Sequence, residues 1–83
     1  MQITVKYRAD LAALTKISGE SMEADNIKDV LKHLKNRFGA QAEKLAKTML
    51  IVVNGRSILL LKAFKTALKD GDEVSFLPIC GGG

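Results

Sequence analysis

The residues with the most unusual chemistry stand at positions 80–83, where Cys80 is followed by Gly81, Gly82 and Gly83. Because glycine has no Cβ, such a segment is thin, can lie extended against another surface and can enter a narrow channel. The carboxylate of Gly83 would be a poor electrophile until ATP adenylates it, since AMP is a good leaving group. A sulfur nucleophile could then displace AMP and leave a thiocarboxylate. The alternative interpretation is a frayed end without a role.

Other groups in the sequence give weaker signals for chemistry. His33 has no motif partner, and we expect it to be an exposed, structural histidine. Asp70, Asp72 and Glu73 form a cluster of carboxylates, but the sequence DGD is more typical of a turn than of a metal site. Cys80 cannot form an internal disulfide, and His33 alone cannot complete a zinc site with it. It is either a small apolar residue or a thiol that could react with an activated terminus. We therefore predict no metal site.

Length and composition narrow the possible classes of function. The chain has 83 residues and a net charge of +4, which indicates one domain whose small core leaves little room for a catalytic pocket. It contains no run close to the roughly 20 apolar residues of a membrane span and no recognisable signal peptide, so we expect a cytoplasmic protein that does not enter membranes. Tyr7 is the only aromatic residue besides three Phe at core spacing, and the lysines are dispersed, which argues against nucleic-acid binding.

The clearest element is a helix that begins near residue 27. Its apolar residues recur on one face of a 3.6-residue period: Ile27, Val30, Leu31, Leu34 and Phe38. Asp25 or Asn26 can cap its N-terminus, and Gly39 can end it. A second short helix is predicted over residues 40–47.

Alternating or continuous apolar residues predict several strands. The segments are 2–8, 49–53, 57–61 and 73–77, with 17–23 as a weaker candidate. Asn54-Gly55 predicts a tight turn after the second of these strands. Residues 9–16 are expected to form a link with a possible helical turn. Residues 62–70 are expected to form an irregular or briefly helical link, anchored by Phe64 and Leu68.

This order of elements predicts an α+β fold in which one main helix packs across a mixed sheet. We expect a β-grasp arrangement over residues 1–78, with the first and last strands side by side in the middle of the sheet. Residues 79–83 would be a flexible glycine-rich tail. The residues expected in the core are Ile3, Val5, Ile27, Leu31, Leu34, Val52 and Val74.

The last sixteen residues resemble the end of a known family. They contain a Leu-x-Asp-Gly-Asp-x-Val strand entry, then Pro78 and a terminal Gly-Gly. This pattern is similar to that of the ubiquitin-like sulfur carriers, which include the small subunit of molybdopterin synthase (MoaD) and the thiamine carrier (ThiS). The chain length is closer to the molybdopterin carrier. Gly81 stands where the family usually has a small side chain, and the stretch 54–70 is longer than is typical.

The resemblance implies a carrier that acts with partners and is not an enzyme by itself. An E1-like adenylating enzyme of the MoeB/ThiF type would activate Gly83 with ATP, and a persulfide protein would supply sulfur. The large subunit of molybdopterin synthase (MoaE type) would then receive the tail and pass sulfur to the pterin precursor. No tightly bound cofactor is implied. Gly81 and Gly82 would keep the tail thin, and Pro78 would stiffen its root by fixing φ.

A carrier body must also be recognised by its partners. If Val74 and Phe76 pack on the helix, strand alternation leaves Leu77 on the open face of the sheet. Leu59 and Leu60 exceed what one buried face needs and could join Leu77 in an exposed docking patch. Tyr7 could belong either to this patch or to the core.

Three alternatives remain open from the sequence. The chain could carry sulfur for thiamine, cysteine or tungsten-cofactor synthesis. It could be a protein modifier joined through Gly83 to lysines of its targets. It could also be an RNA-binding β-grasp module, which would have no use for a glycine end.

Overall fold

The computed structural model describes residues 1–79. Within them the elements run β1 (Gln2–Tyr7), α1 (Ala9–Thr15), β2 (Gly19–Glu23), α2 (Ile27–Phe38), α3 (Ala40–Lys47), β3 (Leu50–Val53), β4 (Arg56–Ser57), the 3-10 turns η1 (Ile58–Leu60) and η2 (Ala63–Lys65), and β5 (Glu73–Leu77). No helix in this part of the chain combines the length and the hydropathy needed to cross a lipid bilayer.

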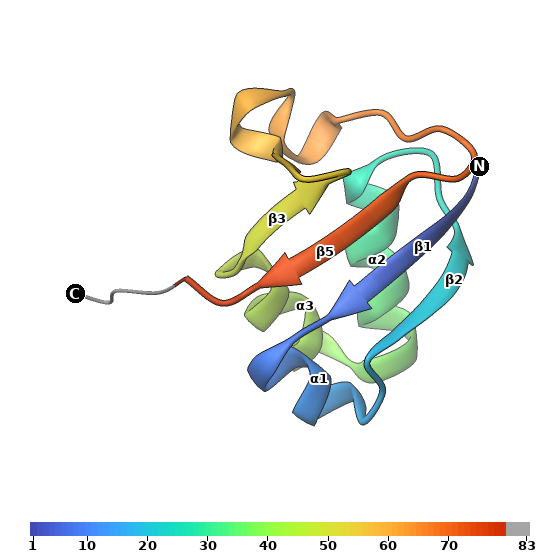
Figure 1. The fold of residues 1–83 in the computed structure, drawn as a ribbon. Helices are drawn as coiled ribbons and strands as arrows, with labels where there is room; N and C mark the ends of the chain where they lie inside the picture. Colours follow the sequence, from blue (N-terminus) through green and yellow to red (C-terminus); the bar gives the residue numbers. More distant parts are fainter. Residues whose placement is uncertain (80–83) are drawn as a thin grey trace.

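The strands of the described chain form one mixed sheet in the order β2-β1-β5-β3-β4. β1 and β5 are parallel neighbours at its centre, while β2 and β3 pair with them in antiparallel fashion. The helix α2 lies across one face of this sheet (Figure 1). The predicted β-grasp fold is therefore confirmed, including the central position of the first and last strands.

The helix α2 follows directly from the sequence. The Asn26 side chain caps its N-terminus by accepting a hydrogen bond from the Asp29 N–H at 2.9 Å. Gly39 ends it with a φ of 96°, a conformation that favours glycine. Four of the five residues predicted on its apolar face are buried, namely Ile27, Val30, Leu31 and Leu34, and Phe38 is half-buried. Each fully buried side chain contributes about 1.5–3 kcal/mol through burial.

The central strand β5 places its apolar residues in the core. Val74 and Phe76 are fully buried, and Phe76 lies opposite Tyr7 of β1 and Ile51 of β3. Because side chains alternate along a strand, Leu77 falls on the other face, where it lies opposite Leu50. The predicted alternation of this strand is confirmed.

The predicted strand over residues 57–61 is wrong. β4 ends at Ser57, whose hydroxyl oxygen accepts a hydrogen bond from the Leu59 N–H at 3.2 Å and starts η1. This local bond replaces ladder pairing with a tight turn. Only Ile58 of the apolar run enters the core, and Leu59 and Leu60 remain exposed.

Two predicted packing positions also differ. Val52 is half-buried, since β3 directs Ile51 and Val53 into the core and Val52 to the opposite face. Phe64 is 40% exposed, so it does not anchor the link as expected, whereas Leu68 is buried as predicted.

Candidate functional site

The C-terminal end of β5 is where the chain leaves the sheet. Leu77 is the last residue of the strand, and Pro78, which has no N–H to donate, cannot continue the ladder. Ile79 follows and is 67% exposed. The predicted reacting segment, Cys80 with Gly81, Gly82 and Gly83, lies outside the described residues. The described part of the site is therefore the exit of the chain and the surface around it.

An apolar groove of about 210 Å³ lies beside this exit. It is lined from β3, η1, η2 and the residue after Pro78. The lining residues are Lys47, Thr48, Met49, Leu50, Ile51, Ser57, Ile58, Leu59, Phe64 and Ile79. Leu59 is 79% exposed. Water around such side chains would be released if a partner covered them, so the groove is suited to docking.

The structure brings only some of the predicted docking residues together. Leu59 lines the exit groove with Ile79. Leu60 is exposed at the neighbouring position of η1, outside the residues that line the groove. Leu77 is half-buried beside Leu50, which itself lines the groove.

Tyr7 belongs to the core and not to the docking surface. It is only 1% exposed, and its ring lies 6.3 Å from that of Phe38 in an edge-on contact. Its hydroxyl donates a 2.6 Å hydrogen bond to Oε2 of Glu20, which also pairs with Arg37. Burial raises the pKa of Tyr7 to about 12, partly offset by the charge of Arg37. Of the two places predicted for Tyr7, the docking patch is the wrong one, because a partner cannot reach its buried ring.

The sequence pattern did not indicate three residues that line this groove: Ile79, Met49 and Phe64. Ile79 was predicted to begin the flexible tail, yet it lines the groove. Leu50 belongs to the predicted strand 49–53, but only the antiparallel pairing of β3 with β5 places it opposite Leu77. Phe64 gave no such signal, since its direction depends on the turn η2.

The DGD sequence forms a bonded turn at the opposite end of β5. Asp70 Oδ1 accepts a hydrogen bond from the Gln2 N–H at 2.8 Å. Asp72 accepts one from the Lys69 N–H at 2.8 Å and another from the Asn54 side chain at 2.9 Å. The backbone bond from Lys69 and then the bond from Asn54 lower the pKa of Asp72. The predicted turn is confirmed, and its carboxylates hold strands together.

His33 is half-buried and not exposed as predicted, because α2 turns it partly toward the protein. Its Nε2 is buried without a hydrogen-bond partner among the described residues. In the same part of the chain, no group of three or more His, Cys, Asp or Glu residues is placed to hold a metal ion.

Comparisons with known proteins agree with this architecture. The ThiS family model matches residues 5–83, while a search of curated proteins finds no match. The small archaeal modifier protein 1 from Methanosarcina acetivorans superimposes with a TM-score of 0.86 at 25% identity, over 99% of this chain and 96% of that one.

Two further solved structures are molybdopterin converting factors. The putative subunit 1 from Pyrococcus furiosus matches with a TM-score of 0.71 at 25% identity, over 94% of this chain and 97% of that one. The complex of subunits 1 and 2 from Helicobacter pylori matches with a TM-score of 0.72 at 24% identity, over 100% of both chains. Since the family model spans nearly the whole chain and the fold is shared with these proteins, this chain belongs to the ThiS family of ubiquitin-like sulfur carriers.

Proposed function

We propose that this protein carries sulfur as a thiocarboxylate on Gly83 and donates it in molybdopterin synthesis as the small subunit of the synthase. The observation that carries the proposal is the family match, which extends through the glycine segment to residue 83. The likeness to a putative molybdopterin converting factor subunit 1 at 25% identity supports the choice of pathway.

The chemistry requires three partner proteins and no catalytic group of the carrier. A carboxylate oxygen of Gly83 attacks the α-phosphorus of ATP on an E1-like enzyme, and pyrophosphate leaves. The terminal sulfur of a protein persulfide then attacks the acyl carbon, and AMP leaves. A second thiol reduces the resulting acyl disulfide and releases the thiocarboxylate. The glycines would let the tail enter the active sites of both the activating enzyme and the large synthase subunit.

The exit of the chain supports this role through its surroundings. Ile79 and Leu59 line an apolar groove directly beside the point where the tail begins. A partner that covers this groove would gain hydrophobic contact while its active site receives the tail. The partner would then bind the carrier next to the point where the tail enters its active site.

Intact mass spectrometry tests the proposal. The carrier isolated from its own cells should show the mass increase of one oxygen-to-sulfur exchange, located by fragmentation at Gly83. A variant that lacks Gly82 and Gly83 should lose both this mass and its ability to support molybdopterin synthesis. If the shortened variant supports the pathway as well as the full chain does, the proposal is wrong.

A second candidate function is conjugation to proteins through Gly83. It is favoured by the TM-score of 0.86 with an archaeal modifier, against 0.71 and 0.72 with the converting factors. A modifier gives a ladder of larger conjugates that depends on Gly83, whereas a dedicated small-molecule carrier gives only free protein of thiocarboxylate mass. An RNA-binding module would keep its RNA affinity after the deletion of Gly82 and Gly83.

A further inference from the structure

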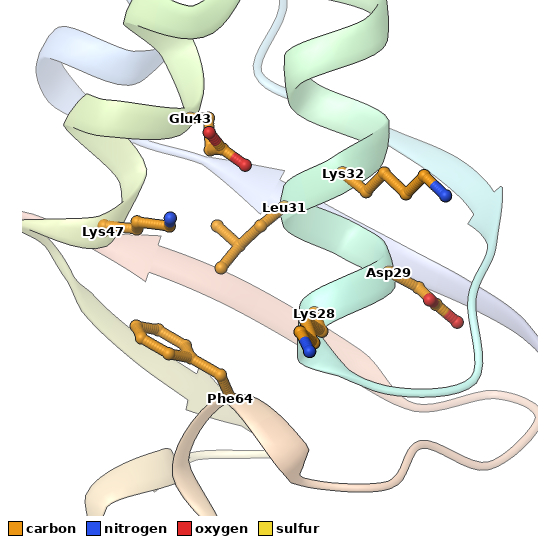
Figure 2. A pocket seen from close by; sticks show the side chains of 7 residues that line it. All are labelled: Lys28, Asp29, Leu31, Lys32, Glu43, Lys47 and Phe64. Carbon is orange, nitrogen blue, oxygen red and sulfur yellow. The ribbon is translucent and has the colours of Figure 1, made fainter.

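A second hollow, of about 400 Å³, lies on the helix side of the molecule between α2, α3 and η2. Figure 2 shows Leu31, Glu43 and Lys47 directed into the space between the two helices, with Lys28 and Phe64 at its η2 end. Lys32 and Asp29 complete the lining and extend toward the far side of α2. We call this hollow the helix-side groove.

The apolar part of the helix-side groove is held in place. Leu31 is buried at its base, and Phe64 stands beside it with 40% of its surface exposed. Phe64 follows Ala63, which has a φ of 51°, a strained conformation for a residue with a Cβ. The buried Thr66 stabilises this turn by donating to the Ala63 carbonyl at 2.7 Å and accepting from the Lys62 N–H at 3.1 Å. The Thr66 carbonyl in turn accepts from the Ile27 N–H at 3.1 Å, which attaches η2 to the start of α2.

Lysines outnumber carboxylates among the residues that line the helix-side groove. Within residues 1–79, none of the ammonium groups of Lys28, Lys32 and Lys47 forms an ion pair. Asp29 is engaged at the start of α2, where its carboxylate accepts from the Asp25 N–H at 3.0 Å. Glu43 is therefore the one lining carboxylate without such a bond in this part of the chain. It lies one turn before Lys47 on α3, and Lys28 lies across the groove on α2. An occupant with its own carboxylate would complement the excess positive charge.

The helix-side groove lies next to the exit groove. Phe64 and Lys47 line both of them, so the two hollows share a wall. A partner seated at the chain exit would reach the helix-side groove without leaving the surface.

We propose that the partner protein which receives the tail also inserts an acidic-apolar segment into the helix-side groove. This inference rests on the proposed function for the presence of such a partner. One apolar side chain of the segment would pack against Leu31 and Phe64. An adjacent aspartate or glutamate would pair with Lys28 and Lys47.

The test uses the full chain, labelled with ¹⁵N, and three blocked synthetic peptides as probes. One has a phenylalanine between two aspartates, one has the phenylalanine between two lysines, and one has a serine between two aspartates. An apolar contact and one charge pair in so short a peptide correspond to a dissociation constant of about 1 mM. The Asp-Phe-Asp peptide should shift the amide signals of Leu31, Lys47 and Phe64, and the other two should not.

Matched variants locate the binding. Lys47→Glu should weaken the Asp-Phe-Asp peptide at least about fivefold, which is about 1 kcal/mol. Phe64→Ala should do the same. Lys35→Glu makes the same charge change on an exposed part of α2 outside the groove and should have no effect. Thermal unfolding of each variant shows that the fold is kept.

Three results would overturn the proposal. The first is the absence of shifts with the Asp-Phe-Asp peptide. The second is equal binding of the Asp-Ser-Asp peptide, which would indicate a simple anion site. The third is a set of shifts confined to Leu59 and Leu60. Because the peptides bind without activation of Gly83, these results are independent of the thiocarboxylate mass that tests the proposed function.

Discussion

The two ends of β5 are built in opposite ways. At its N-terminal end, Asp72, Asp70 and Asn54 satisfy backbone and side-chain donors from three neighbouring segments. At its C-terminal end, Leu77 lies opposite the half-buried Leu50 of β3, and Ile79 lines a groove together with the exposed Leu59 of η1. Figure 1 shows that β5 runs from one end of the sheet to the other. The N-terminus of the chain lies near the start of β5. The hydrogen bonds at the N-terminal end, which we call the bonded end, fix the position of the strand. The C-terminal end, which we call the apolar end, offers a surface that a partner could cover.

The largest effect on stability is expected at the bonded end. Asp72→Ala removes the acceptor of the Lys69 N–H and of the Asn54 side chain. Because both bonds go to a charged group, the free energy of unfolding should fall by about 2–3 kcal/mol. Urea unfolding measures this change. Asp10→Ala, at an exposed helix position, serves as the control and should cost well under half as much. Equal losses of unfolding free energy in the two variants would show that the hydrogen bonds of Asp72 do not stabilise the fold.

Alkaline pH should lower the free energy of unfolding through Tyr7, which lies opposite Phe76 near the C-terminal end of β5. Burial raises the pKa of Tyr7 to about 12 from its ordinary value of 10.0. The contribution of protonated Tyr7 to the free energy of unfolding is fully present below the ordinary pKa. It is lost as the pH rises through the pKa of the folded protein. The unfolding free energy should therefore fall between these two pH values, and less so in Tyr7→Phe. Phenolate absorbance in the folded protein that rises at the ordinary pKa would contradict this.

Acid should lower the free energy of unfolding through Asp72 at the bonded end of β5. Hydrogen bonds from Lys69 and Asn54 lower the pKa of Asp72 below its ordinary value of 3.8. Its contribution to folding is therefore present above that value and is lost as the pH falls through the lower, folded pKa. Asp72→Asn should lose less stability than the unchanged chain over this acid range. Parallel stability curves for the two proteins would show that Asp72 does not contribute.

At the apolar end, Leu77→Asp should affect binding more than folding. Leu77 is half-buried on the sheet face opposite α2, so a carboxylate there should cost about 1 kcal/mol of stability. Binding to the activating enzyme should weaken because the charge must lose water on docking. Calorimetric titration beside thermal unfolding separates the two effects. Matching losses of stability and binding would mean that Leu77 is only a structural residue.

The smallest stability change is expected for Leu59→Ser. Leu59 is 79% exposed, so the unfolding free energy should change by no more than about 0.5 kcal/mol. Partner affinity should nevertheless fall, since Leu59 lines the exit groove. Leu14→Ser, at an exposed leucine of α1, is the matched control. If both variants bind the partner as the unchanged chain does, the exit groove is not a docking site.

Much of the fold could be predicted because its signals are local. The period of α2 and its cap at Asn26 depend on neighbouring residues alone. The same holds for the turn at Asn54-Gly55, where both residues have positive φ. The alternation of β5 also follows from the chain itself, and so does the prediction that Leu59 and Leu60 exceed the needs of the core.

The errors share a physical cause, which is competition between local and distant contacts. Four apolar residues after Ser57 predict a strand, yet the Ser57 hydroxyl oxygen accepts a hydrogen bond from the Leu59 N–H, and the ladder ends there. Val52 and Tyr7 both lie in predicted strands, but the sheet directs Val52 outward and Tyr7 inward. Which of two faces a residue occupies depends on what packs on the sheet.

The sequence by itself indicated a β-grasp member of the ThiS family, because the DGD strand entry, Pro78 and the glycine segment are patterns of adjacent residues. Only the tertiary structure decided which leucines and which phenylalanine remain on the surface beside the chain exit. Side-chain exposure depends on segments that are far apart in sequence, such as β3, η2 and Ile79, and their meeting is a consequence of the packed sheet.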